Sequence, residues 1–139
     1  MARFSESELT GSAATINLLR SAMLAGVLIF AACATYLVRS GSVSVVEPPL
    51  IRAMQWAALG VAALTVGWIL LMRSLRERAS SVSSRNSLAL IGSAFPEGLA
   101  LFGGVIMQLG GPPFVLLAGI LLFIVAWRAL PGEDAAPTS

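Results

Sequence analysis

The stretch AMQWAALGVAALTVGWILLM, Ala53 to Met72, decides the fold, because its twenty consecutive residues carry no charge. A helix of that length rises about 30 Å, which matches the hydrocarbon core of a bilayer. Backbone amides and carbonyls find no partners in lipid, so a spanning segment must pair them internally, as a helix does. The stretch therefore predicts a transmembrane helix.

The composition of the whole chain fits that assignment. Of its 139 residues 57% are hydrophobic and 12% charged, about half the charged fraction of a soluble domain, and the mean hydropathy is +0.86. With one cysteine and no histidine, neither an internal disulfide nor a metal site is expected, and no cofactor is implied. A net charge of +2 is too small to indicate a nucleic-acid partner. We expect one integral membrane domain over residues 1–139.

Four segments are long and apolar enough to cross a bilayer. We predict an all-α, four-transmembrane-helix bundle with spans at 16–38, 53–72, 86–109 and 113–130. An N-terminal tail (1–15), a basic loop (73–85) and a disordered tail (131–139) would lie on one side of the membrane.

The arginines predict which side this is. Seven lie on the side shared by the two termini and the basic loop, and two lie on the other side. Cytoplasmic segments carry the excess of basic residues, so both termini should be cytoplasmic, in a bacterial inner membrane. A lipoprotein cleavage site at Phe30–Cys33 is the weaker alternative, because the polar leader before it carries Glu6 and Glu8. The seven are Arg3, Arg20, Arg73, Arg76, Arg78, Arg85 and Arg128; the two are Arg39 and Arg52.

Glu97, in GSAFPEGLALFGG (92–104), lies near the middle of the third span. An ionised carboxylate at the bilayer centre costs at least about 2.5 kcal/mol. Every arginine is expected at the end of a span, so none should reach Glu97. We expect Glu97 to be buried and protonated, with Thr65 as its closest hydrogen-bond partner.

Pro96 precedes this acid and lacks an amide hydrogen, which predicts a kink and an unpaired carbonyl at Gly92. A carbonyl beside an acid could hold a proton, a water or a cation. The candidate ion-binding set is therefore Glu97, Pro96, Gly92, Ser93 and Thr65. The alternative is purely structural, with Glu97 pinning two helices by one hydrogen bond.

One face of the third span is polar or small along its length. At 100° per residue its members lie close to one direction, which is typical of a face packed against protein. We predict that this helix is the most enclosed of the four. Besides Ser93 and Glu97, the helix-packing stripe contains Asn86, Ala100, Gly104 and Gln108.

The segment FPEGLALFGGVIMQL resembles the acid-bearing helix of rotary ATP synthase c subunits. Glu97, Leu99, Phe102 and Gly103 occupy matching places, and the resemblance implies that Glu97 is an ion-binding carboxylate. The preceding span has only Gly60 and Gly67 where c subunits carry regularly spaced glycines, which argues against a ring-forming rotor subunit.

The second half of the chain resembles small, uncharacterised four-span bacterial membrane proteins. Their third span also reads Ala-x-x-Glu-x-x-Ala-Leu-x-Gly, here Ala94 to Gly103, and a short glycine turn follows. This resemblance implies no activity. Small multidrug exporters also have four spans and one embedded acid, but in their first helix.

No catalytic constellation is evident, so we do not expect an enzyme. Our first hypothesis is a non-enzymatic structural or accessory subunit with a buried, protonated Glu97. The second is a proton- or cation-coupled carrier in which Glu97 binds the ion. The expected partners are the lipid bilayer and, for so small a bundle, further copies or a larger membrane complex.

Overall fold

The computed structural model describes residues 13–42 and 46–134, and within them the fold is all-α. Three of the four helices are long and apolar enough to cross a membrane, and the last is a shorter apolar helix of 16 residues. The helices are α2 (Ala13–Arg39), α3 (Pro48–Arg78), α4 (Val82–Gln108) and α5 (Phe114–Ala129).

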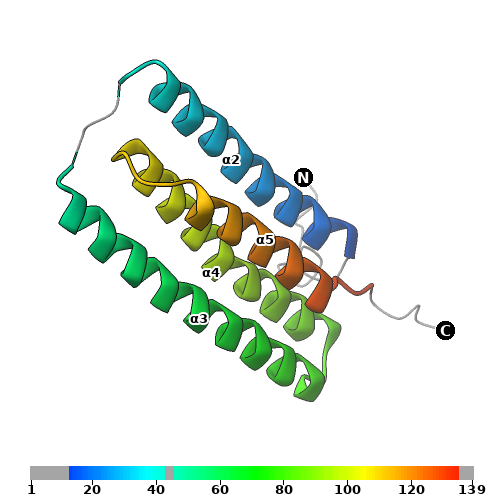
Figure 1. Ribbon diagram of the computed structural model, residues 1–139. Helices are drawn as coiled ribbons and strands as arrows, with labels where there is room; N and C mark the ends of the chain where they lie inside the picture. The colour runs from blue at the N-terminus through cyan, green and yellow to red at the C-terminus, as the bar shows by residue number, and fades with distance from the viewer. Residues whose placement is uncertain (1–12, 43–45, 135–139) are drawn as a thin grey trace, which may run out of the picture.

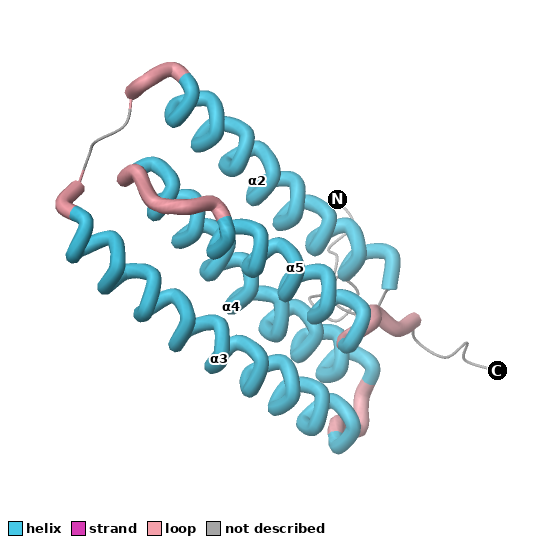
Figure 2. Tube along the Cα trace, viewed as in Figure 1, coloured by secondary structure: helices cyan, strands magenta, loops and turns pink. Residues whose placement is uncertain are grey.

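The helices run alternately up and down as a bundle (Figures 1 and 2). α4 and α5 form a central antiparallel pair, and α2 and α3 lie on either side of it (Figure 1). The start of α2, the link from α3 to α4 and the end of α5 therefore meet at one end of the bundle. We call this the arginine end, because it gathers Arg20, Arg73, Arg76, Arg78, Arg85 and Arg128.

At the arginine end the predicted loop 73–85 is wrong. α3 continues to Arg78 and α4 begins at Val82, so only residues 79–81 connect them. Ser81 caps α4 by accepting a hydrogen bond from the Ser84 amide at 3.1 Å, which satisfies one of the unpaired amides of a helix start. The prediction failed because the charged residues of this stretch were interpreted as a loop, although arginine and glutamate extend a helix readily.

The turn at the opposite end is short because α4 has a glycine cap. Gly110 has a φ of 91°, a conformation that glycine adopts without strain. The Gly110 and Gly111 amides donate to the carbonyls of Met107 and Ile106 at 3.0 and 2.8 Å. α5 then begins at Phe114, directly after Pro112 and Pro113.

The central pair packs backbone to backbone through glycines. A Cβ atom on Gly103 would overlap the backbone of Leu116, and one on Gly119 would overlap the backbone of Ala100. Small residues let membrane helices approach closely and gain dispersion contacts. Of the residues in the apolar 18-residue stretch of each long helix, 50% are buried in α4, against 11% in α2 and 22% in α3. The third predicted span is therefore the most enclosed of the long helices, as expected.

Candidate functional site

Arg20 is fully buried where α2, α4 and α5 meet at the arginine end. Its Nε donates to the Ser93 hydroxyl at 3.1 Å, and Nη2 donates to the Ala89 carbonyl at 2.7 Å. Its Nη1 donates to the Leu130 carbonyl at 2.5 Å and, more weakly, to the Trp127 carbonyl at 3.4 Å. One side chain of α2 thus ties α4 to the end of α5.

The acceptors explain how a buried cation is tolerated there. The last carbonyls of a helix lack intrahelical partners and form the negative end of its dipole. Leu130 and Trp127 supply such carbonyls at the end of α5. The Trp127 ring lies 5.9 Å from the guanidinium carbon of Arg20, close enough for a cation–π contact. Arg20 therefore caps α5 from outside, and among the described residues it has no carboxylate partner.

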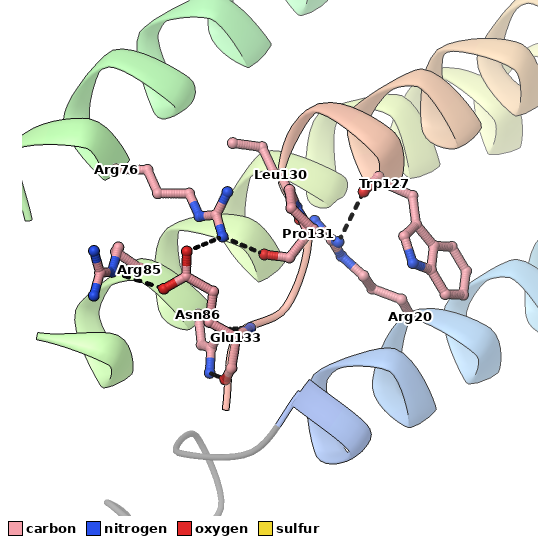
Figure 3. A network of polar contacts seen from close by, with 8 residues as sticks. All are labelled: Arg20, Arg76, Arg85, Asn86, Trp127, Leu130, Pro131 and Glu133. Atoms are coloured by element: carbon pink, nitrogen blue, oxygen red, sulfur yellow. Dashed lines mark hydrogen bonds and ion pairs between the residues drawn. The ribbon is translucent and has the colours of Figure 1, made fainter. Parts of the chain in front are cut away.

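Glu133 forms a second polar cluster at the same end (Figure 3). Its carboxylate lies 3.0 Å from Nη2 of Arg76 and 3.0 Å from Nε of Arg85. Its backbone amide and carbonyl each form a 2.9 Å hydrogen bond with the Asn86 side chain. Arg76 also donates to the Pro131 carbonyl at 2.5 Å, so α3, α4 and the segment after α5 are tied together.

These contacts correct the predicted disordered tail at 131–139. Residues 131–134 are held in place, since Glu133 binds α3 and α4 and the Asp134 carboxylate accepts a 2.9 Å hydrogen bond from the Ala13 amide. Residues 135–139 lie outside the described part of the chain, as do residues 1–12 of the predicted N-terminal tail. Pro131 and Gly132 were read as the start of a free tail, whereas they direct the chain back onto the bundle.

Glu97 lies on the flank of α4 and is only partly buried. The expectation of a buried acid is therefore wrong for the single chain. Within the described residues Glu97 forms neither a hydrogen bond nor an ion pair. Thr65 is fully buried, but its hydroxyl donates to the Val61 carbonyl at 2.7 Å within its own helix rather than to Glu97.

Gly92 and Ser93, two other members of the candidate ion-binding set, contact other parts of the bundle. Gly92 and Pro96 are buried, and α4 continues through Pro96 as one helix. A Cβ atom on Gly92 would overlap the side chain of Leu130, which places Gly92 in the contact with the end of α5. Ser93 accepts from Arg20 and donates to the Ala89 carbonyl at 3.1 Å. Gly92 and Ser93 therefore serve helix packing and the Arg20 cluster.

The helix-packing stripe is largely buried. Asn86, Ala100 and Gly104 are enclosed, and a Cβ atom on Gly104 would overlap the Phe30 ring of α2. Gln108 is only partly buried, like Glu97. The stripe thus faces α2 at Ser93 and Gly104 and the α5 side at Asn86 and Ala100, and its two members at one edge remain partly open.

Arg20 was not predicted as a site residue, because an arginine near the start of a span was assigned to the membrane surface as a topology signal. One signal was available: Arg20 lies inside an apolar segment, after Leu18 and Leu19, and α2 begins seven residues before it. An arginine two turns inside a helix needs acceptors on neighbouring helices, unlike one at its end.

Comparisons with known protein families, curated proteins and solved structures gave no significant match to this chain.

Proposed function

We propose that the protein is a non-enzymatic subunit of a bacterial inner-membrane assembly, with four spans and both termini in the cytoplasm. In this assembly the flank of α4 that carries Glu97 contacts a further protein chain, either another copy or a different membrane protein. The bundle itself acts as a rigid scaffold, held by the α4–α5 packing and by the Arg20 cluster.

The observation that carries the proposal is the environment of Glu97. Glu97 is central in α4, fifteen residues after Val82 and eleven before Gln108, and it has no partner among the residues that the structure describes. A carboxyl group left in lipid without a hydrogen bond is costly, and polar residues of transmembrane helices usually face protein or water. A neighbouring chain that donates or accepts one hydrogen bond would remove this cost.

The test compares Glu97→Gln with Glu97→Leu in protein extracted together with its native lipids. Glutamine can still form a hydrogen bond and should preserve the assembly, whereas leucine should release single chains, as measured by light scattering. Leu101→Ala, one turn along α4, is the control for an unspecific change of the flank. A monomeric wild-type protein, or an assembly that survives Glu97→Leu, contradicts the proposal.

A second candidate function, a proton- or cation-coupled carrier, is favoured by the same partial exposure, since a carrier carboxylate must be reachable. The infrared carboxyl band of Glu97, followed across about pH 5 to 9 with Glu97→Gln as the blank, distinguishes the two. A band that titrates in this range supports the carrier. A band that stays constant supports the assembly contact.

A further inference from the structure

A hollow of about 420 Å³ opens at the arginine end between α3, α4 and the end of α5. Arginine dominates its charged lining, which therefore has an excess of two positive charges. These residues are Arg73, Arg76, Arg85 and Arg128, together with Glu77 and Glu133.

The four arginines differ in whether a carboxylate already neutralises their charge. Arg76 and Arg85 hold Glu133 between them at 3.0 Å each. Arg73 has only a 3.7 Å pair with Glu77, and both of these side chains are more than half exposed. Arg128 is exposed and forms no ion pair with any described residue. Arg73 and Arg128 are therefore available to an anionic ligand.

A second hollow, of about 410 Å³, adjoins the first one. It is lined by Ile124, Trp127, Arg128 and Pro131, so Arg128 and Pro131 belong to both hollows. Trp127 and Arg128 lie three and four positions after Ile124, and Pro131 lies four and three positions after them, so the four residues follow one face of α5 and its extension. An arginine-rich hollow at the end of the bundle and an apolar hollow along α5 thus lie on either side of Arg128 and Pro131.

We propose that the two hollows together bind one anionic glycerophospholipid. Its phosphate lies between Arg73 and Arg128, since guanidinium groups match phosphate oxygens in geometry and charge. One acyl chain follows Ile124 and Trp127 along α5. The site lies where the helices leave the apolar region, which is the depth of lipid phosphates in a bilayer. The apolar hollow favours a lipid over free phosphate, which would leave it empty.

The test titrates the full-length protein in detergent with phosphatidylglycerol, using phosphatidylcholine with the same chains as the neutral comparison, and counts bound lipid by native mass spectrometry. We expect one phosphatidylglycerol to bind about tenfold more tightly than phosphatidylcholine. Arg128→Gln should weaken binding about fivefold, and the double variant Arg73→Gln/Arg128→Gln about twentyfold, which corresponds to about 1 kcal/mol per arginine. Neither arginine takes part in the contacts that fix the residues after α5.

Arg78→Gln is the matched control, because Arg78 is an exposed arginine at the same end that does not line either hollow. It should change the affinity less than twofold. If Arg78→Gln weakens binding as much as Arg128→Gln, or if the two lipids bind equally, the site is only diffuse surface charge and the proposal is wrong.

Two further experiments distinguish binding of the whole lipid from binding of its phosphate alone. Ile124→Trp fills the apolar hollow and should weaken phosphatidylglycerol severalfold; unchanged binding would contradict the acyl-chain part. Inorganic phosphate at matched concentration should not displace the lipid, and if it does, the ligand is a free anion. Glu97→Gln should bind lipid like the wild type, so this site is tested independently of the proposed assembly.

Discussion

The arginine end and the middle of α4 treat their charged groups in opposite ways. At the arginine end, Arg20 donates to four oxygens and Glu133 pairs with two arginines. In the middle of α4, Glu97 has no partner in the described chain, although glycine contacts pack the helices on its other side most tightly. A charged residue in a membrane helix thus stabilises the bundle only where oxygens or opposite charges from neighbouring helices reach it. The carboxyl group of Glu97 has no such partner within the described part of the single chain.

Replacing Arg20 should produce the largest effect of all. Arg20→Met should lower the free energy of unfolding by about 3 kcal/mol or more, because it removes the donor to the buried Leu130 carbonyl at the end of α5 and breaks the hydrogen bonds to Ser93 and Ala89 of α4. Arg20→Lys, which keeps the charge but loses the planar fork, should lie in between. The measurement is unfolding in mixed micelles with increasing dodecyl sulfate, followed by circular dichroism. Arg78→Met is the control, and a loss below about 1 kcal/mol for Arg20→Met would show that Arg20 is not structural.

The close packing of α4 against α5 can be tested by comparing a glycine in that contact with a glycine that has no neighbour. Gly103→Ala should cost about 1–3 kcal/mol, because the new methyl group overlaps the backbone of α5. Gly67→Ala, with nothing within 4 Å of the new atom, should be neutral or stabilise by up to about 1 kcal/mol through helix propensity. The same unfolding experiment measures both. Equal effects would mean that the α4–α5 contact is looser than the structure shows.

Glu133→Gln sharpens the comparison at the arginine end. It removes two ion pairs of a partly exposed carboxylate but keeps the backbone hydrogen bonds to Asn86, so the loss should be about 0.5–1 kcal/mol. The effect should shrink as salt is added, because exposed pairs are screened. Glu77→Gln, whose single pair is long and exposed, should change the stability less. Identical unfolding of both variants would contradict a structural role of Glu133.

Glu97→Gln should have the smallest effect on the isolated chain. Because Glu97 forms no hydrogen bond or ion pair with any described residue, its replacement should change the free energy of unfolding in detergent by less than about 0.5 kcal/mol. A loss comparable with that of Arg20→Met would reveal a partner inside the same chain, and the assembly proposal would lose its basis.

The sequence predicted the class of the fold well. Uncharged stretches such as Ala53–Met72 indicate membrane helices by length alone, and the small residues at Ala100 and Gly104 indicated the enclosed face of α4. Helix ends were harder, since Arg73–Arg78 continues a helix outside the apolar stretch and composition alone does not show where such an extension stops.

The partial exposure of Glu97 could not be predicted from the sequence. Helical periodicity gives the direction in which each side chain of α4 points, but not how wide an arc of α4 the neighbouring helices cover. At 100° per residue, Ser93 lies about 20° from Ala100, but Glu97 lies about 60° and Gln108 about 80° from it. α2 and α5 cover the first part of this arc, and the last two residues remain partly open. Similarly, the residues near Arg20 in the sequence do not indicate which oxygens accept its hydrogen bonds, because these oxygens lie 69 to 110 positions further along the chain.

That separation has a consequence for biosynthesis. Arg20 belongs to α2, whereas two of its acceptors, Trp127 and Leu130, lie 107 and 110 positions later and are therefore synthesised well after it. Until α5 is in place, the guanidinium must remain in the polar headgroup region, because a charge without acceptors is not stable among lipid chains. α2 can therefore reach its final depth only after α5 has been inserted, and a chain truncated before α5 would leave Arg20 without two of its carbonyl acceptors.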